Sequence, residues 1–358
     1  MNIDPTAPLF DNMRNEGYRV SLGGLNPTAA SCVITDEYGR KTMVGKCHRQ
    51  EWYRKTGVER TEQLNNDTYI KFEVGKAMET AFQERWNSEG VLLGGNIKVR
   101  EDIGTEDEPL IISGELDALL RSYETDNEGN ITSISTTEAV GIELKTGRGR
   151  FQKKEIYGYG NKKYKNGFPR LEHIMQTAMY LHMRKPLEEY YNVKIPYFQI
   201  VYVLVDDGVT NWFNISLSND YDGDIIIRDR YNELCEPDPL WALESGLSMT
   251  TIGDFSIENI KTRYLRVQKA IESEEIPDRE FQLRYDEETF EELSDMGLLT
   301  KTAIKNYNAN ELNRIGDWNC RYCDWSRECY PFDVLTGAVE DGLMNPKDAL
   351  DKLGVTMF

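Results

Sequence analysis

The chain has 358 residues, enough to bury a large core either as one elaborated domain or as a core with a helical lobe. Its 61 acidic and 42 basic side chains give a formal net charge of −19, which taken alone argues against a nucleic-acid partner. No apolar run resembles a signal peptide or is long enough to span a bilayer, and six scattered cysteines do not indicate a disulfide framework, so we expect a cytoplasmic protein with no membrane partner.

The N-terminal segment is predicted to be an arm that leads to a cysteine. Residues 1–30 are rich in Pro, Gly and Asn and are expected to wrap the body of the protein. A short hairpin is predicted over 31–45, and Cys47 follows it at the start of a basic and aromatic run. The first predicted unit, 1–65, consists of this arm and Cys47.

A long helix and a strand are predicted next. The spacing of apolar residues predicts a helix over 66–88 with one packed stripe. The stripe consists of Tyr69, Phe72, Ala77, Ala81 and Phe82. Residues 95–103 have the pattern of a strand, and an acidic loop separates them from the strand that follows.

Two further strands carry the polar residues around which we expect the chain to be organised. The first, 114–120, carries Asp117, and the second lies in GIELKTGRG, 141–149, with Glu143 and Lys145. Because residues two apart in a strand point to the same side, Glu143 and Lys145 share one face. Turn-forming Asp, Asn and Gly residues lie between the two strands, so an antiparallel hairpin or meander is predicted.

The register of this hairpin decides whether the two carboxylates can act together. A two-residue turn at 128–129 sets Asp117 opposite residue 140, three positions short of Glu143. A bulge or bend around 136–140 is then needed to place both carboxylates on one face.

Glu143 and Lys145 form the only acidic-x-Lys triplet in the sequence. A carboxylate can hold a divalent cation, and an ammonium beside it can orient or polarise the water that attacks a phosphodiester. The alternative is a cross-strand ion pair on a solvated sheet, and the triplet alone does not distinguish the two.

A basic segment follows the triplet. From Lys145 to Arg170 there are nine Lys or Arg residues and a single acid, Glu155, with aromatic residues interleaved. Basic side chains suit phosphates and aromatic rings suit bases, so the segment is predicted to bind nucleic acid, although a solvated charged loop is the alternative. The predicted phosphate contacts are Arg148, Arg150, Lys153 and Lys154.

A helix predicted over 171–184 carries a group of polar side chains. Gln176 and Tyr180 stand four apart on one face of it, with His173 and Thr177 beside them. Strands are predicted over the two apolar runs that follow, at 197–205 and 212–218.

From about residue 220 the pattern turns helical. A core-facing stripe there is predicted to serve packing only. The stripe consists of Ile257, Ile260, Tyr264, Val267 and Ile271.

Three cysteines cluster near the C-terminus. Cys320, Cys323 and Cys329 have a C-x2-C-x5-C spacing, which leaves one tetrahedral position open for Cys47 as the natural fourth ligand. Four soft sulfurs suit an iron–sulfur cluster or zinc, and either would close a very long loop. A chance group of unligated thiols is the alternative.

Together these features resemble a known nuclease family. The order and spacing of the motifs are similar to those of the PD-(D/E)XK nuclease superfamily in its RecB-like branch. The cysteines narrow the resemblance to the iron–sulfur exonucleases of CRISPR adaptation, their viral relatives and the AddB-type nuclease domain. It spans roughly residues 45–331, and the motifs that carry it are Asp117, Glu143-x-Lys145 and Gln176-x3-Tyr180.

The resemblance implies a role for each of these positions. Lys145 would position or activate the hydrolytic water, and Gln176 and Tyr180 would help to hold the DNA strand. The implied ligands of Mg²⁺ or Mn²⁺ are Asp117, Glu143 and the backbone carbonyl of Leu144. The implied ligands of a structural 4Fe–4S cluster are Cys47, Cys320, Cys323 and Cys329.

One position departs from the family pattern. Where the family has Gly-x3-His on the helix before the sheet, this chain has Gly75-x3-Glu79. If the helix packs as the family's does, Glu79 points at the metal as a third carboxylate. The alternative is a surface glutamate that pairs with Lys76.

We therefore predict an α/β, restriction-endonuclease-like core of mixed sheet flanked by helices over 66–220, and a helical lobe with the cluster-binding segment over 221–358. The expected function is metal-dependent DNA hydrolysis, exonucleolytic on single-stranded DNA or free ends. A catalytically degenerate DNA-binding or assembly subunit of the same fold is the alternative. The resemblance implies partners in recombination, replication or CRISPR adaptation, in a prokaryotic cell or a virus-infected host.

Overall fold

The computed structural model describes most of the chain. The described residues are 24–35, 41–61, 66–162, 164–236, 255–295, 299, 301–309, 316–321 and 323–331. The predicted N-terminal arm lies outside them except for 24–30. Among the helices of these described ranges, none is long and apolar enough to cross a membrane.

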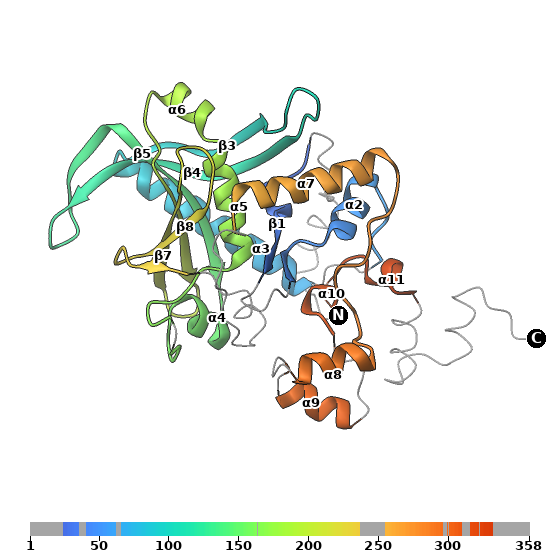
Figure 1. Cartoon of the computed structure of the whole chain (residues 1–358). Coiled ribbons are helices and arrows are strands. Elements are labelled where there is room, and N and C mark those ends of the chain that lie inside the picture. The colour runs from blue at the N-terminus through green and yellow to red at the C-terminus, as the bar shows by residue number, and fades with distance from the viewer. Residues whose placement is uncertain are drawn as a thin grey trace, which may run out of the picture.

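A seven-stranded mixed sheet forms the centre of the fold (Figure 1). Its strands lie in sequence order, β5 and β6 are parallel, and all other neighbours are antiparallel. The parallel step uses a helical crossover through α4 (Gly149–Ile156), α5 (Leu171–His182) and α6 (Lys185–Tyr191). The strands are β3 (Leu92–Asp102), β4 (Ile111–Thr125), β5 (Ile131–Gly147), β6 (Phe198–Leu204), β7 (Val209–Leu217), β8 (Ile225–Asp229) and β9 (Leu234–Cys235).

Helices flank both faces of this sheet. α3 (Asn66–Ser88) contacts β3, β4 and β5, and its Trp86 packs on a small apolar cluster of the sheet. α5 contacts β6 and β7 and contributes to the main core on the opposite face. The small cluster consists of Ala118, Leu120, Val140 and Ile142.

A further layer connects the beginning of the described chain to its end. α7 (Ile257–Glu272) packs against α5, against β1 (Ser31–Thr35) and against α2 (His48–Thr56) (Figure 1). The predicted α7 stripe is confirmed, since four of its members are buried and Ile271 is partly buried. The other elements are η1 (Pro27–Ala29), β2 (Lys41–Gly45), α8 (Glu287–Asp295), α9 (Lys301–Asn308), α10 (Trp318–Arg321) and α11 (Ser326–Cys329).

The predicted helix over 66–88 is confirmed as α3, but its predicted apolar stripe is wrong. Phe72 is 53% exposed, and Ala77 and Ala81 are exposed as well. The half-buried side of the helix instead includes Gly75, where an added Cβ would lie 3.6 Å from Thr146 of β5, and Trp86, against which Phe82 packs edge-on with ring centroids 5.3 Å apart. Apolar spacing therefore located the helix, but of the predicted stripe Phe82 packs whereas Phe72, Ala77 and Ala81 do not.

The prediction of helical structure from about residue 220 is also wrong. Residues 225–229 form β8, which pairs with β7, and β9 extends the sheet further. The side chains of Ile225, Ile227 and Asp229 alternate with half-buried neighbours, which is the period of a strand. The helical part of the described chain after the sheet begins at Ile257.

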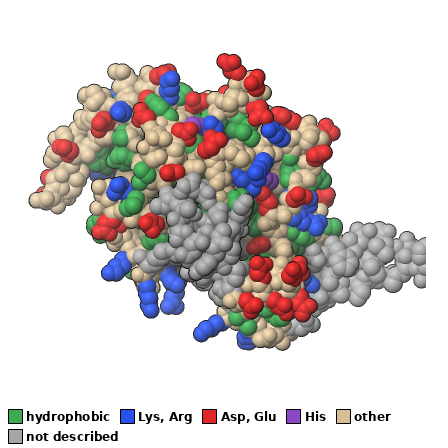
Figure 2. Space-filling model, in the orientation of Figure 1, with side chains coloured by type: hydrophobic (Ala, Val, Ile, Leu, Met, Phe, Trp, Pro, Cys, Tyr) green, Lys and Arg blue, Asp and Glu red, His purple; other side chains and the backbone are tan. Residues whose placement is uncertain are grey.

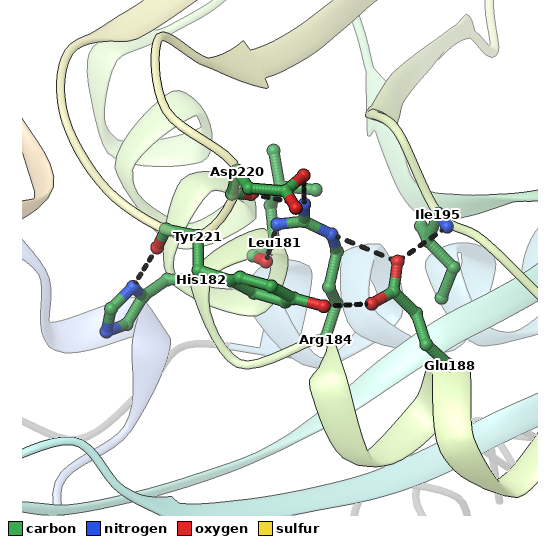
Figure 3. Close-up of polar contacts among 7 residues, drawn as sticks. All are labelled: Leu181, His182, Arg184, Glu188, Ile195, Asp220 and Tyr221. Carbon is green, nitrogen blue, oxygen red and sulfur yellow. Dashed lines mark hydrogen bonds and ion pairs between the residues drawn. The ribbon is translucent and has the colours of Figure 1, made fainter.

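A buried arginine holds the crossover together at the end of α5 (Figure 3). Arg184 is 3% exposed, donates to the carbonyl of Leu181 at 2.9 Å, and pairs with Glu188 at 3.3 Å. Its guanidinium also bonds Asp220 and stacks on the Tyr221 ring with a centroid distance of 4.3 Å. The α5–α6 corner is thereby fixed to the loop after β7.

Glu188 carries this network on to the start of β6. Its Oε1 accepts from the backbone N–H of Ile195 at 2.8 Å, and its Oε2 accepts from the Tyr221 hydroxyl at 2.5 Å (Figure 3). Both carboxylate oxygens are therefore satisfied, as a largely buried charge requires.

We expect Arg184→Met to lower the free energy of unfolding by about 3 kcal/mol, because it leaves Glu188 without its cation in a desolvated site. Arg230 is a matched control, since its guanidinium stacks on Tyr231 at 4.8 Å but both side chains are exposed. Arg230→Met should change stability by less than about 0.5 kcal/mol. Urea unfolding of the two variants measures both values, and equal losses would contradict a structural role for the buried network.

Candidate active site and cysteine pocket

The pairing of β4 with β5 sets Asp117 opposite Glu143. Ala118 pairs with Ile142 in this antiparallel ladder, and one further step at the same offset places the backbone of Asp117 opposite that of Glu143. The two predicted strands therefore meet in the register that a shared site requires.

The pairing register between β4 and β5 shifts in the segment where a bulge or bend was predicted. Near the tip of the hairpin Tyr123 pairs with Ile134, whereas Arg121 pairs with Ala139, so three extra residues are accommodated on β5. The predicted bulge around 136–140 is thus confirmed.

The extra residues of β5 are pinned by the segment that precedes β6. The backbone N–H of Lys194 donates to the carbonyl of Thr137 at 2.8 Å, and the carbonyl of Lys194 accepts from Ala139 at 2.9 Å. Lys194 directly precedes Ile195, which Glu188 holds. The bulge is therefore bonded to the same segment that the Arg184 network fixes.

Glu143 lies at the bottom of the site, in contact with α5. It is 1% exposed, and its Oε1 accepts from Lys145 Nζ at 2.5 Å and from Gln176 Nε2 at 2.8 Å. Lys145 also donates to Gln176 Oε1 at 3.2 Å. The other oxygen, Oε2, is buried and has no partner among the described residues. Such an orphaned carboxylate oxygen is costly unless a cation or a donor reaches it.

Asp117 stands where the alternation along β4 changes phase. Leu116 and Leu119 both pack in the main core, while Ala118 packs in the cluster on the other face. The Asp117 carboxylate accepts from the backbone N–H of Leu144 at 2.6 Å. It is thereby fixed against β5 at the centre of the acidic-x-Lys triplet.

The charges of the site act on one another. Burial and the charge of Glu143 raise the pKa of Asp117 to about 8, against the opposing effect of Lys145. Burial lowers the pKa of Lys145, but Glu143 and Asp117 more than offset this and leave it raised. Glu79 adds to both shifts, so its carboxylate lies within electrostatic reach of the site.

Glu79 is held by two amide side chains that the sequence analysis missed. Its Oε1 accepts from Asn96 at 2.6 Å and from Gln83 at 3.2 Å, and Gln83 also donates to the carbonyl of Asp117 at 2.8 Å. Asn96 has a left-handed backbone, with φ of +50°, which Asn tolerates better than most residues. The Gly-Gly-Asn sequence at 94–96 was the available signal, because it interrupts a strand pattern.

No three His, Cys, Asp or Glu side chains among the described residues form a group that could hold a metal ion as they stand. Glu79 therefore acts on Asp117 and Lys145 through its charge in this arrangement. The donor set nevertheless fits a hard divalent cation, because it offers two paired carboxylates and the orphaned Glu143 Oε2.

Two residues implied to hold DNA are buried. Tyr180 is 2% exposed and donates to the carbonyl of Glu115 at 2.8 Å, while Gln176 is 6% exposed and bonded within the site. Both position β4 and β5 against α5, and neither presents its polar group to solvent.

The basic segment is partly paired. Lys153 forms an ion pair with Asp207, while Arg148, Arg150 and Lys154 are exposed on and beside α4. Figure 2 shows Lys and Arg side chains projecting from the edge of the molecule where α4 lies in Figure 1. Among the four predicted phosphate contacts, three are therefore exposed and one is engaged in an ion pair.

The four predicted cluster cysteines line one pocket. Its other lining residues include Arg49, Arg279, Tyr53 and Tyr330. Arg49 donates to Cys329 Sγ at 3.7 Å. The Tyr53 and Trp325 rings stack with their centroids 6.3 Å apart. The pocket's four cysteines are Cys47, Cys320, Cys323 and Cys329.

The pocket joins segments from the two ends of the described chain. Trp325 donates to the carbonyl of Val58 at 2.9 Å, across 267 residues of sequence, and packs with Trp52 and Tyr53. Asp324 pairs with Arg60 at 3.1 Å. The predicted approach of the first cysteine to the later three is confirmed.

Four thiols are the donor type that a soft metal centre uses, but among the described residues no three of them form a group that could hold an ion as they stand. Burial raises the pKa of Cys47 and Cys320, and raises that of Cys323 to about 11, with the neighbouring thiols adding repulsion. Clustered thiols that resist ionisation are stabilised as thiolates by a cationic centre.

Cys32 and Cys235 lie apart from this pocket. Both are buried, Cys32 in β1 and Cys235 in β9, and both belong to the main core. They serve as packed core thiols.

Comparisons with known proteins add little. No model of a known protein family matches the chain, and no curated protein matches it. A solved structure reported as "Crystal structure of SSO0001" aligns with 88% of this chain and 89% of its own, at 12% sequence identity and a TM-score of 0.36. A likeness at this level carries no argument about fold or function.

We expect Asp117→Asn to stabilise the metal-free protein at pH 8. The folded-state pKa of Asp117 lies above its ordinary value of 3.8, so the cost of its charge is absent below that value, grows as pH rises from there and is complete above about 8. Asn keeps the shape and can still accept from Leu144. In a chelator-containing buffer Tm should rise by about 3 °C or more at pH 8, and the difference should shrink as pH falls toward 5.

Asp126→Asn in the turn of the same hairpin is the control. Hydrogen bonds from Asn130 and from nearby backbone N–H groups lower the pKa of Asp126, so its removal should not raise Tm. An Asp117→Asn variant that melts at or below the wild-type temperature at pH 8 would show that the carboxylate is not strained.

Proposed function

We propose that the chain is a metal-dependent deoxyribonuclease of the PD-(D/E)XK type. The observation that carries the proposal is the paired Asp117 and Glu143, with Lys145 bonded to Glu143 and one buried oxygen of Glu143 left without a partner in the described chain. A cross-strand ion pair on a solvated sheet does not account for a carboxylate that is 1% exposed.

Asp117, Glu143 and the backbone carbonyl of Leu144 would hold Mg²⁺ or Mn²⁺. When bound, the ion supplies Lewis-acid activation of water and neutralises charge on the scissile phosphate. Glu79 would add negative charge beside these ligands, which favours a hard cation. This metal role would also satisfy the orphaned oxygen of Glu143.

Lys145 would bind and orient the attacking water. Its side chain is 23% exposed, so the ammonium is reachable from solvent, and Glu143 with Gln176 fix its position. With its pKa raised, the group holds its proton and acts by donating hydrogen bonds. Gln176 would serve as the positioning residue that connects Lys145 to α5.

The DNA strand would approach along α4. Arg148, Arg150 and Lys154 supply local positive charge on a chain whose net charge is −19. Single-stranded DNA, or DNA with free ends, is the substrate that the family resemblance favours. The family resemblance is also the basis for proposing partners in recombination, replication or CRISPR adaptation.

Cys47, Cys320, Cys323 and Cys329 would hold a 4Fe–4S cluster. Its role would be structural, because the pocket joins α2 to the last described segment and lies in a different part of the chain from the carboxylates. Zinc is the other soft-metal candidate for the same four thiols.

A catalytically lapsed DNA-binding or assembly subunit is the second candidate. It is favoured by Glu79, whose Oε1 is already bonded by Asn96 and Gln83. The nuclease proposal accounts for more of the site, since a lapsed site has no use for the strained carboxylate pair or for Lys145 beside it.

The deciding experiment measures cleavage of end-labelled single-stranded DNA with Mg²⁺, with Mn²⁺ and with chelator. We expect Lys145→Ala to reduce cleavage by about 10²-fold or more while DNA binding is kept, because it removes only the donor that orients water. Lys98→Ala, an exposed lysine on β3, is the control and should cleave normally. Undiminished cleavage by Lys145→Ala would remove the triplet from the proposed mechanism.

Protein purified without oxygen should be brown and contain about four irons per chain. Cys320→Ser should lose iron and unfold at a lower temperature, because it breaks the proposed cluster-mediated link between α2 and the last described segment. Cys235→Ser, which alters a buried thiol outside the pocket, should keep its iron. A colourless protein with one tightly held zinc would retain the thiolate site and exclude the cluster.

A further inference from the structure

A hydrogen-bonded pair beside Lys145 has no role in the function proposed above. Tyr202 on β6 pairs directly with Lys145 in the parallel β5–β6 ladder, so both side chains stand on the same face of the sheet. His173 on α5 lies against Tyr202, with Nδ1 2.8 Å from the hydroxyl oxygen and the rings 5.6 Å apart. His173 is also one helical turn before Gln176, which contacts Lys145.

The hydrogen bonds of Tyr202 determine where its proton goes. The backbone N–H of Arg170 donates to the Tyr202 hydroxyl oxygen at 3.1 Å. Tyr202 is 2% exposed, and in the described chain its hydroxyl has no partner besides Arg170 and His173. The hydroxyl must therefore donate to Nδ1 of His173, since any other arrangement leaves a buried O–H unpaired.

His173 consequently carries its own proton on Nε2. Burial and the nearby cations Lys145, Arg170 and Lys46 lower the pKa of His173 well below its ordinary value, so the ring is neutral. A neutral ring whose Nδ1 accepts is protonated at Nε2. Nε2 has no partner within the described ranges and is not one of their buried unpaired atoms, so this N–H of the half-buried ring is not fully enclosed.

The other two histidines of the chain hold the opposite tautomer. Nδ1 of His182 bonds the carbonyl of Tyr221 (Figure 3), and Nδ1 of His48 lies 3.2 Å from the Glu280 carboxylate. A carbonyl or carboxylate only accepts, so each of these rings is protonated at Nδ1. His173 is the one histidine of the three that offers an Nε2–H.

We propose that His173 binds a phosphate oxygen of the DNA strand beside Lys145, through Nε2–H, and that Tyr202 positions it by fixing the tautomer. A rigid neutral donor among three cations suits an anionic oxygen, because it donates a hydrogen bond without adding a charge that must be desolvated. This inference rests on the proposed nuclease function and identifies a group that holds the substrate there.

Nuclear magnetic resonance of protein labelled with ¹⁵N-histidine tests the inference without metal or cleavage. Three histidines give a simple spectrum, in which His173 should show the Nε2–H tautomer and His182 the Nδ1–H tautomer. Addition of a single-stranded oligothymidylate in chelator should shift the His173 nitrogens and leave those of His182 and His48 in place. His173→Gln assigns the signal by its loss.

Binding of the same oligonucleotide, followed by fluorescence anisotropy, supplies the energetic test. His173→Phe should weaken binding about tenfold or more, as expected for a lost hydrogen bond to a charged group. His173→Gln, which retains a donor, should recover most of the affinity. His182→Gln on the same helix is the matched control and should bind as the wild type does.

Tyr202→Phe separates positioning from packing, because it removes the hydroxyl and keeps the ring. The His173 spectrum should then show a mixture of tautomers, and DNA affinity should fall part of the way toward that of His173→Phe. The double variant should bind no more weakly than His173→Phe alone. An unchanged tautomer and affinity in Tyr202→Phe would refute the role given to Tyr202.

The outcomes distinguish this inference from the nuclease proposal. Wild-type protein that binds and cleaves DNA, with His173 resonances that do not move, overturns the inference and leaves the nuclease in place. A His173 ring protonated at Nδ1 also overturns it. Wild-type protein that neither binds nor cleaves DNA overturns both.

Discussion

The offset between β4 and β5 is the constraint on which the candidate site depends. In the register of the hairpin tip, Asp117 would stand opposite residue 140, and Glu143 would face no carboxylate. The three extra residues that correct this are bonded to Lys194, whose neighbour is held by Glu188 and, through it, by buried Arg184. A polar network at the α5–α6 corner thus supports the alignment of two carboxylates that it does not touch.

Much of this architecture follows from local sequence rules, and the rest depends on contacts that those rules do not describe. The strand period and turn residues predicted the hairpin, and counting back from the turn predicted the irregularity of β5. The packing of α3 was not predictable, because a helix with apolar residues on several sides gives no unique stripe, and only the sheet decides that Trp86 packs while Phe72 is exposed. Asn96 and Gln83 were missed because amides carry no charge pattern, and their importance appears only when β3 is laid beside Glu79.

The buried charges of the site destabilise the folded state. The carboxylates of Asp117 and Glu143 share a poorly hydrated space with Lys145, within electrostatic reach of Glu79, and the cost is visible in the raised pKa of Asp117. Stability elsewhere must offset this cost, and the extensive core on the α5 face is well placed to do so, since α5 contributes both to that core and, through Gln176, to the site. Rigidity of α5 and chemistry at Glu143 are therefore properties of one element.

The contact between Val58 and Trp325 has a consequence for biosynthesis. A ribosome that adds about 5–20 residues per second needs roughly 13 to 53 seconds to make the 267 residues that separate the two. During that interval Trp325, which packs on Trp52 and Tyr53 in the finished protein, has not yet been made. Cys47 likewise has none of the three cysteines that line its pocket in the folded chain. The order of synthesis therefore exposes an aromatic surface and one reactive thiol to chaperones and oxidants before the pocket can close.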